Sequence, residues 1–407
     1  MKIRNVENKA FLWTFVMRLF AHNILKDSQH FLPKGNYDAR HGKFPRYFSG
    51  WYLFVNSKGL AEGEIIHKKL NGLDLVVHRN KEGVPVIHSD RCTHMDGMFS
   101  GGLGTVIDGK IVCGYHKYRF ENGVPQSGPK EFRNDVKNCI PCFKVKEVHG
   151  LIMFWFDAES ENGIGEPQWE LDLPDVSHLE RRAFTRSITP THMAPLHENI
   201  VDDQHFVLLH EADRYKSTPQ AYFEQHRFKT ANTMRVKLPH KIGPFQFNKN
   251  PDLDMVMDSE FFGLGIHINS VDIRGFKATV IHCTTPIEDE ITEWSLSVYM
   301  PKRKWFAKLD TAWFMNNIVY PWGMIAQTYR LHTQDRRTFF EKSRYDFYED
   351  APKGFEKVNM FRRWIQEELL HQKRPMRKNS VATTYVSEED IEKNSRSVSK
   401  VEVDLVS

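Results

Sequence analysis

Short apolar runs separated by glycine- and asparagine-rich turns fill the first part of the chain. Four such runs between residues 44 and 158 are rich in Val, Ile, Leu and aromatic residues: 52–55, 73–78, 84–88 and 151–156. Runs of this length and composition predict β-strands. We therefore expect a small all-β domain over residues 44–158, with loops at the strand ends.

Longer apolar runs follow an acidic stretch with Gly and Pro at residues 159–174, which predicts a connection between two domains. Strands are predicted at 182–188, 222–238, 261–273, 276–285 and 291–300, the last two as a hairpin around 288–290. Residues 305–340, rich in Trp, Phe, Met and Ala, predict a long helix. An antiparallel sheet with a long helix against it forms a helix grip. The expected fold class is therefore α+β, with this second domain over residues 159–375.

The two ends of the chain differ from the predicted domains. Residues 10–25 are apolar and aromatic but include Arg18 and His22, and they are too short to span a bilayer. No clear small-residue cleavage site accompanies them, which argues against a signal peptide. An amphipathic helix in an N-terminal arm, residues 1–43, is expected to pack on the core; peripheral contact with a membrane is the alternative. Residues 376–407 are polar and predict a disordered tail.

Composition and charge narrow the function classes. The 407 residues are 40% hydrophobic and 27% charged, as in soluble globular proteins. A formal net charge of +4 is too small to indicate nucleic-acid binding, although it favours docking of an acidic partner protein. Five cysteines do not predict a disulfide framework. Cys139 and Cys142 form a C-x-x-C that we interpret as structural, and Cys283 reads as a buried core thiol.

Four residues in two short motifs predict a metal cluster. Cys92-Thr93-His94 and Cys113-Gly-Tyr-His116 each place a histidine two or three positions after a cysteine. Two thiolates and two imidazoles in this order suit a Rieske [2Fe–2S] cluster. Glycines around both motifs allow the backbone to approach the cluster closely. A structural zinc site also uses mixed Cys and His ligands, but zinc fingers usually pair like residues within one motif.

A second group of candidate ligands lies in the segment that begins at Asn199. Asp202 precedes His205 by three residues, and His210 follows five residues later. Two such histidines and a distant carboxylate would form the ligand face that leaves positions open on Fe(II) for dioxygen and substrate. An H-x4-H pair also occurs by chance as ordinary surface or core histidines, so this motif is weaker evidence when it stands alone.

With both motifs in place, the chain resembles the oxygenase components of Rieske non-haem iron oxygenases, over about residues 48–364. Asn199, Asp202, His205 and His210 match the N-x-x-D-x-x-H-x4-H motif of that family. Three further segments resemble the sterol-type branch, which includes 3-ketosteroid 9-alpha-hydroxylase and cholesterol 7-desaturase: Gly50-Trp51-Tyr52, Glu198-Asn199 and Phe361-Arg-Arg-Trp364. The cluster loops depart from the family pattern. Thr93 stands where proline is usual, and the usual Cys-Pro-x-His-Gly-Trp is replaced by Cys113-Gly-Tyr-His116-Lys-Tyr118.

The resemblance implies a complete electron-transfer arrangement. Asp335 matches the third iron ligand, and Asp202 the acid that links a cluster histidine to an iron histidine across subunits of a homotrimer. The implied cofactors are a Rieske cluster and mononuclear Fe(II), with dioxygen as co-substrate. Electrons would come from NAD(P)H through a reductase or ferredoxin. Iron–sulfur chemistry favours a reducing, cytoplasmic compartment.

The expected function is oxidation of a C–H bond, by hydroxylation or desaturation, in a large apolar and sterol-like molecule. Tailoring of a specialised natural product by oxidative cyclisation, hydroxylation or demethylation is the alternative. An electron carrier with an inactive second site, or a lipid-binding module, is disfavoured by the intact iron ligands. Five residues are candidates to line the substrate pocket, each also compatible with a plain core role: Phe206, Val207, Phe262, His267 and Asn269.

Overall fold

The structure is a computed structural model. It describes residues 45–128, 138–189, 191–209, 213–237, 241–242, 245–246, 252–273, 276–288, 291–302, 335 and 350–371. The predicted arm at 1–43, the tail at 376–407 and the long helix at 305–340 lie outside these residues, apart from Asp335. Among the described residues, no helix is long and apolar enough to cross a membrane.

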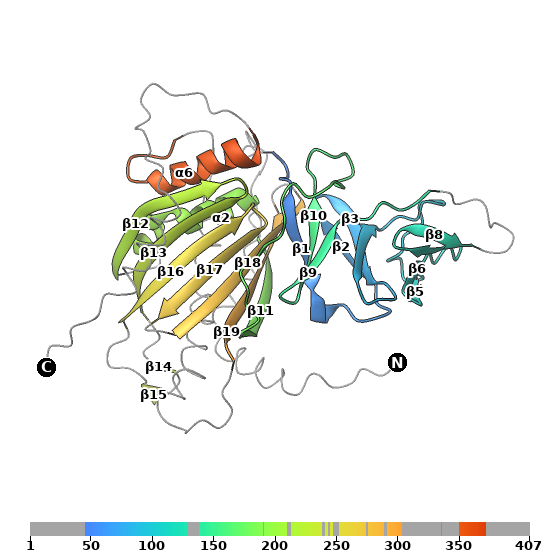
Figure 1. The fold of residues 1–407 in the computed structure, drawn as a ribbon, viewed down its shortest axis with the longest axis horizontal. Coiled ribbons are helices and arrows are strands. Elements are labelled where there is room, and N and C mark those ends of the chain that lie inside the picture. Colours follow the sequence, from blue (N-terminus) through green and yellow to red (C-terminus); the bar gives the residue numbers. More distant parts are fainter. Residues whose placement is uncertain are drawn as a thin grey trace, which may run out of the picture.

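Residues 50–156 form three small antiparallel sheets (Figure 1). One contains β1 (Gly50–Asn56), β10 (Leu151–Phe156) and β9 (Val145–Val148), with the short helix η2 (Ser57–Gly59) after β1. A second contains β2 (Ile66–Leu70), β3 (Leu73–Arg79) and β4 (Pro85–Ser89). The third contains β5 (Thr105–Ile107), β6 (Lys110–Val112), β7 (Arg119–Glu121) and β8 (Val124–Ser127). The four strands expected here from the sequence coincide with β1, β3, β4 and β10.

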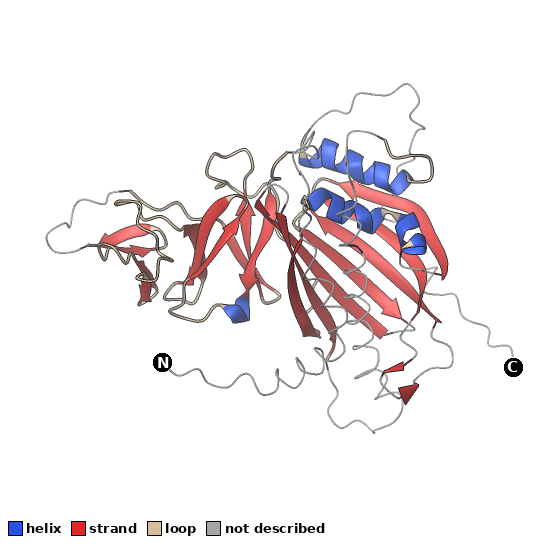
Figure 2. Cartoon of the chain, turned by 180° about the vertical axis from the view of Figure 1, so that it is seen from behind, coloured by secondary structure: helices blue, strands red, loops and turns tan. Residues whose placement is uncertain are grey.

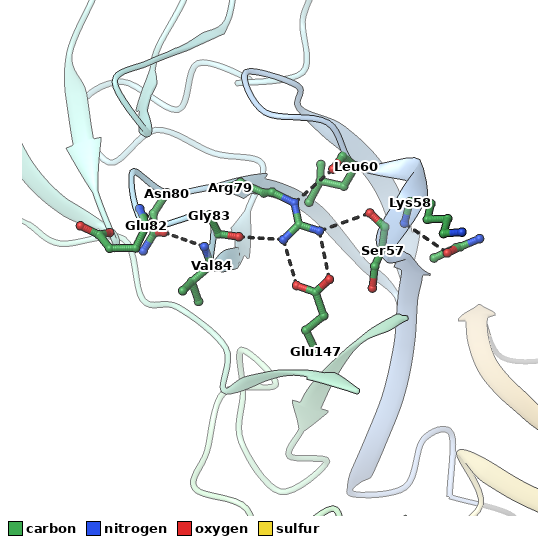
Figure 3. Close-up of polar contacts among 10 residues, drawn as sticks. Ser57, Lys58, Leu60, Arg79, Asn80, Glu82, Gly83, Val84 and Glu147 are labelled. Atoms are coloured by element: carbon green, nitrogen blue, oxygen red, sulfur yellow. Dashed lines mark hydrogen bonds and ion pairs between the residues drawn. The ribbon is translucent and has the colours of Figure 1, made fainter. Parts of the chain in front are cut away.

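Arg79, at the end of β3, connects two of these sheets (Figure 3). Its guanidinium donates to the carbonyls of Leu60, Ser57 and Gly83 at 3.1, 3.2 and 2.7 Å. It also donates to both carboxylate oxygens of Glu147 on β9, at 2.9 and 3.1 Å. This fork lowers the pKa of Glu147, because the hydrogen bonds favour the charged carboxylate. One side chain thus fixes the loops that follow β1 and β3 against β9.

The second part of the chain is built on one antiparallel sheet of seven described strands. Its strand order is β11 (Leu179–Thr189), β19 (Ile291–Pro301), β18 (Phe276–Glu288), β17 (Ile266–Ile273), β16 (Asp252–Phe262), β13 (Arg227–Lys237) and β12 (Asp213–Glu224). A small separate hairpin pairs β14 (Lys241–Ile242) with β15 (Phe245–Gln246). The expected α+β fold class, with an antiparallel sheet in the second domain, is confirmed.

Helices cover one face of this sheet (Figures 1 and 2). They are α2 (Met193–Val201), α3 (Asp203–Leu208) and α6 (Glu356–Trp364), and α6 continues into the π-helical turn η5 (Ile365–Leu369). The opposite face packs against β1 and β10 of the first domain, where Trp51 and Trp155 join Phe262 and Ile281 in one apolar cluster. Both faces of the sheet are therefore buried near its middle.

Two of the strands predicted from the sequence are each interrupted by a turn. The expected strand at 222–238 is the end of β12, a turn at 225–226, and β13. Gln225 takes a φ of 50° there. The sequence does not predict this left-handed conformation, because the residue is neither Gly nor Asn. The expected strand at 261–273 breaks at residues 263–265, where Gly263 has a φ of 57°.

Candidate metal centres

The two cluster loops share one backbone design. In each loop the cysteine carbonyl accepts a hydrogen bond from the N–H four residues later, and the cysteine N–H donates to the carbonyl five residues later. The bonds are Asp96 N to Cys92 O at 2.9 Å, Cys92 N to Gly97 O at 2.9 Å, Lys117 N to Cys113 O at 3.0 Å, and Cys113 N to Tyr118 O at 2.9 Å. Two matching loops therefore present Cys92 and Cys113 in equivalent positions.

The two cysteine sulfurs lie together in the interior of the domain. Cys92 and Cys113 are each 2% exposed. A hydrogen bond between the sulfurs raises the pKa of Cys92 and lowers that of Cys113 to about 5. The backbone also approaches closely here, since a Cβ added at Gly97 would lie 3.2 Å from the Cys113 sulfur. Two cysteine sulfurs in contact under a tight glycine loop suit the sulfur ligands of one iron of a [2Fe–2S] cluster.

The two histidines lie together on the outer side of the loops. The ring centroids of His94 and His116 are 4.7 Å apart and the rings are nearly perpendicular. Nδ1 of His94 is buried and has no hydrogen-bond partner within the described part of the chain. A buried nitrogen lone pair beside a second imidazole fits a metal ligand. No three candidate ligands among the described residues converge on one ion position, so the fit here rests on a cysteine pair and a histidine pair.

The departures from the family pattern have clear structural roles. The hydroxyl of Thr93 donates to the carbonyl of Asn138 at 2.9 Å, which ties the first loop to the segment before Cys139. Tyr118 is 2% exposed and its ring centroid lies 4.5 Å from that of His94. Lys117 has a φ of 60° at the position where the family usually has glycine. The loop keeps its form although the residue there carries a Cβ.

Asp202 separates α2, which carries Asn199, from α3, which carries the candidate ligand His205. Its backbone N–H donates to the carbonyl of Glu198 at 3.1 Å and ends α2, with φ −80° and ψ 97° at the break. Its carboxylate then accepts from the N–H groups of Gln204 and His205, at 3.0 and 3.3 Å, as the N-cap of α3. Asp202 therefore sets the angle between the helices and the place of His205.

His205, Asn199 and Asp335 meet at this break. Nδ1 of His205 lies 2.7 Å from the carbonyl of Asp202, which can only accept, so Nδ1 is the donor and Nε2 is the nitrogen directed toward Asp335. Nε2 lies 3.6 Å from Oδ1 of Asp335, with the two side chains 10% and 13% exposed. Asn199 donates from Nδ2 to the same oxygen at 3.0 Å. An imidazole nitrogen and a carboxylate oriented toward each other fit two ligands of one metal ion.

Two sequence candidates in this region lie outside what can be described. His210, the expected third ligand, is not among the described residues, and the side chain of Val207 is not described either. The fit to a mononuclear iron therefore rests on His205 and Asp335, with Asn199 and Asp202 holding them.

The remaining pocket candidates separate onto two faces of the sheet. Phe206 packs with Met257, Val271 and Val280 on the face that bears the helices. Phe262 lies on the opposite face, in the apolar cluster against the first domain, so it does not share a pocket with Phe206.

His267 and Asn269 lie next to each other in a buried polar group that the sequence did not predict as a whole. Asn269 accepts from the hydroxyl of Ser259 at 2.7 Å, and its amide lies 3.2 Å from Nε2 of His282. The ring centroids of His267 and His282 are 4.8 Å apart. Burial lowers the pKa of His267 well below its ordinary value and keeps the ring neutral. Ser259 and His282 lie among apolar residues on one face of β16 and β18, and this pattern was the available signal for them.

Both parts of the chain match the profile of a known protein family. A profile of the Rieske [2Fe-2S] domain matches residues 50–144. A profile of the 3-ketosteroid 9alpha-hydroxylase C-terminal domain matches residues 154–366, more than half of the chain. The first match includes all four cluster candidates, and the second includes Asn199, Asp202, His205, His210 and Asp335.

One curated relative and two solved structures show how far the likeness extends. Cholesterol 7-desaturase nvd of Xenopus laevis is 26% identical over 289 residues, which span 63% of this chain and 60% of that protein. The chain thus spans less than two thirds of this relative's length. Dicamba monooxygenase bound to dicamba has a TM-score of 0.57 at 15% identity, covering 81% of this chain and 99% of that one. The reduced complex between oxygenase and ferredoxin in carbazole 1,9a-dioxygenase has a TM-score of 0.53 at 15% identity, covering 80% and 90%.

These structures share the fold, with a Rieske domain followed by a catalytic domain. The relationship itself is shown by the sequence profiles, which cover residues 50–144 and 154–366. The chain belongs to the Rieske oxygenases whose catalytic domain is of the 3-ketosteroid 9alpha-hydroxylase type.

Proposed function

We propose that this chain is the oxygenase component of a Rieske-type enzyme that oxidises a C–H bond of a large apolar, sterol-like substrate with dioxygen. The observation that carries the proposal is the meeting of His205 and Asn199 with Asp335, which is 130 residues later in sequence than His205. A fold that brings these three groups together beside an apolar sheet face has the parts of an iron site next to a substrate pocket. The family match supports the same reaction class.

The proposed ligand sets follow the pairs seen in the fold. Cys92 and Cys113 would hold one iron of the cluster, and His94 and His116 the other. His205, His210 and Asp335 would hold the mononuclear iron. When bound, the cluster supplies single electrons and the mononuclear iron supplies the dioxygen chemistry.

Asn199 and Asp202 have supporting roles in this proposal. Asn199 fixes the orientation of Asp335 through its amide, while Asp202 holds the proton of His205 on Nδ1 through its carbonyl. That tautomer leaves Nε2 as the metal-binding atom. The carboxylate of Asp202, which accepts from the backbone N–H of His205, would in addition accept from a cluster histidine and so link the two metal centres.

The proposed substrate pocket is the helix-bearing face of the sheet. Phe206 follows the ligand His205 directly and packs with methionine and valine side chains, which suits an apolar molecule. His267 and Asn269 precede Val271 on β17 by four and two residues and therefore lie on the same face of the sheet. They would supply the few polar contacts that orient such a ligand. The relative from Xenopus laevis is named for a reaction on cholesterol, which is a molecule of this kind.

A homotrimer would bring the cluster of one subunit close to the iron site of another, because the two sites are far apart within one chain. The β5–β8 sheet beside the cluster loops lies at the end of the molecule remote from α2 (Figures 1 and 2). Around the cluster histidines, Met95, Leu103 and Tyr115 are 62%, 68% and 65% exposed. Exposed apolar side chains at such density indicate a contact surface. In the proposed trimer, the Asp202 region of a neighbouring subunit covers them.

The proposal also includes the electron donor, the cellular compartment and the domain boundaries. An electron-donating reductase or ferredoxin is the expected partner, as the solved complex of an oxygenase with ferredoxin illustrates on this fold. The described cysteines are free of disulfides, which supports a reducing, cytoplasmic location. We propose domain boundaries of 44–158 and 159–375; the profile matches at 50–144 and 154–366 are compatible with two domains, although the second match begins five residues before residue 159.

The test is metal content followed by turnover. Iron and acid-labile sulfide are measured per chain on anaerobically purified protein, and the reduced form is examined by EPR. Three irons, two sulfides and a Rieske signal are expected. Incubation with cholesterol or a 3-ketosteroid, dioxygen and a surrogate reductase should then give a product with one added oxygen atom or two fewer hydrogens. Two irons per chain, with no uptake of a third on reconstitution, would contradict the proposal and favour an electron carrier.

A further inference from the structure

Helix α6 makes direct contacts with the elements that carry the proposed iron ligands. It packs against α2 on the helix-bearing face of the sheet (Figure 1). Just before it, the carbonyl of Gly354 accepts from the side chain of Gln204 on α3 at 3.4 Å. At its C-terminal end, the indole N–H of Trp364 donates to the carbonyl of Gln225 at 2.8 Å. The helix is thus attached both to the ligand segment and to the sheet.

The strongest of these contacts is a buried ion pair between Arg362 and Glu198. Arg362 donates from Nε and Nη2 to the two carboxylate oxygens of Glu198, at 2.7 and 2.9 Å. The residues are 9% and 6% exposed. A two-pronged bond of this kind fixes the relative orientation of its partners, because the planar guanidinium matches the carboxylate geometry.

Net stability is a weak explanation for such a pair. Removing two charges from water costs several kcal/mol each, and well-packed apolar residues often stabilise as much or more. What a buried pair provides more readily is a single geometry. The question is therefore which geometry depends on Glu198.

Glu198 lies in the last turn of α2, directly beside the proposed iron ligands. Its carbonyl accepts the N–H of Asp202, the residue at which α2 ends and the turn toward His205 begins. The next residue, Asn199, donates to Asp335. A shift of Glu198 therefore moves the residue that holds Asp335 and the residue that caps the helix of His205.

We propose that the Arg362–Glu198 pair is a positioning device for the mononuclear iron site, by which α6 fixes the last turn of α2 so that Asn199 and His205 face Asp335. This inference rests on the proposed function, because it requires that these residues bind a metal. Arg362 and Glu198 act through their neighbours and touch neither metal nor substrate.

The chain offers two matched controls on the same helix. Arg363 is the next residue and pairs with Glu367 one turn later at 3.2 Å, within the α6–η5 segment itself. Lys357 is 3% exposed and donates to Asn232 on β13 at 2.5 Å. Arg363→Met also removes an arginine of α6, but the ion pair of Arg363 is with Glu367 and not with α2. Lys357→Met breaks a buried polar contact of α6 that leads to the sheet and not to the iron segment.

The experiment measures Fe(II) affinity of the mononuclear site by anaerobic competition with a chelator, with the Rieske EPR signal as the internal count of folded chains. It compares the wild type with Arg362→Met, Arg363→Met and Lys357→Met, and the unfolding midpoint of each variant is recorded. Arg362→Met is expected to bind Fe(II) about 10- to 100-fold more weakly with an unchanged Rieske signal, as for other groups that orient metal ligands. Arg363→Met and Lys357→Met are expected to stay within about twofold of the wild type. Glu198→Gln, which keeps the shape and one hydrogen-bonding oxygen, is expected to fall between the wild type and Arg362→Met.

Two results would overturn the inference alone. One is an Arg362→Met variant that binds Fe(II) as tightly as the wild type. The other is a Lys357→Met variant with a similar unfolding midpoint that loses as much affinity as Arg362→Met, because α6 would then act through general stability. A wild-type chain that takes up no mononuclear iron contradicts the proposed function and this inference together, so the two failures are distinguishable.

Discussion

Asp96 and Lys117 occupy the same position in two different loops, each four residues after a cluster cysteine and each in the left-handed backbone region. Their φ angles are 58° and 60°. Asp tolerates this conformation better than most residues, whereas a lysine gains no compensating local hydrogen bond. The second loop therefore stores backbone strain that the first largely avoids.

Replacing Lys117 by glycine should relieve that strain. A left-handed conformation costs a residue with a Cβ about 1–2 kcal/mol, and the greater freedom of glycine in the unfolded chain offsets about 0.5–1 kcal/mol of the gain. Lys117→Gly is expected to stabilise the Rieske domain by about 0.5–1 kcal/mol, measured by denaturant unfolding of the cluster-loaded protein. Lys117→Ala is the control, since it removes the long side chain but keeps the Cβ. Equal midpoints for the two variants would show that the backbone is not strained.

Asp202 has two separable roles, as a helix cap and as a proposed charged link between metal centres. Asp202→Asn keeps an oxygen that can accept from the N–H groups of Gln204 and His205 but removes the charge. We expect it to retain both metals and nearly the wild-type stability, with slow reoxidation of the reduced Rieske signal in single turnovers. Asp202→Ala loses the cap as well and should lower stability by about 0.5–2 kcal/mol. Rapid reoxidation in Asp202→Asn would leave Asp202 with the capping role alone.

The amide of Asn199 donates to Asp335 and helps to orient its carboxylate. Asn199→Ala removes the donor at 3.0 Å, so the carboxylate is free to turn away from His205. Fe(II) affinity at the mononuclear site is expected to fall about 10- to 100-fold, with the unfolding midpoint nearly unchanged. Asn162→Ala, in the connecting segment with an exposed side chain, is the control. An affinity of Asn199→Ala equal to that of the control would assign Asn199 a structural role only.

The parts of the fold that the sequence predicted are those with a local signal. Strands such as β1 and β10 are continuous apolar runs between turn residues, and the proposed cluster ligands lie in two motifs with spacings of two and three residues. The hairpins at Gln225 and Gly263 were missed for opposite reasons. The first turn has no turn-forming residue at its left-handed position, and the second has glycine between two strands that read as one run.

Local sequence patterns could not predict contacts between residues that are far apart in the sequence. Nothing in the spacing of Glu198 and Arg362 shows that they pair across 164 residues, although each lies in a segment typical of the sterol-type branch. The face occupied by Phe262 shows a related limit. Phe261 and Phe262 are neighbours on β16 and point to opposite faces, so one packs under the helices and the other against the first domain. Composition alone predicts that Phe261 and Phe262 are both buried, but it does not predict which face of the sheet each one occupies.

Buried histidines in the first domain make its stability depend on pH. His78 and His88 are both fully buried with ring centroids 5.6 Å apart, and burial lowers their pKa values to about 3 and about 4. In the unfolded chain both should titrate near pH 6.5. Between pH 6.5 and about 4 the unfolded state therefore binds protons that the folded state does not, so stability falls as the pH is lowered.

Each of these histidines should contribute a loss of about 1.4 kcal/mol per pH unit in that window and nothing above it. His78→Leu removes one of the two titrations, and burial without a polar ring also avoids the cost of its unpaired nitrogens. We expect the slope of unfolding free energy against pH, followed through the Rieske signal between pH 6 and 4.5, to decrease by about 1.4 kcal/mol per unit. Because the ring is neutral in both states at pH 7.5, the slope there should be the same in variant and wild type. An acid slope unaffected by His78→Leu would mean that His78 is protonated in the folded domain, which its burial against His88 argues against.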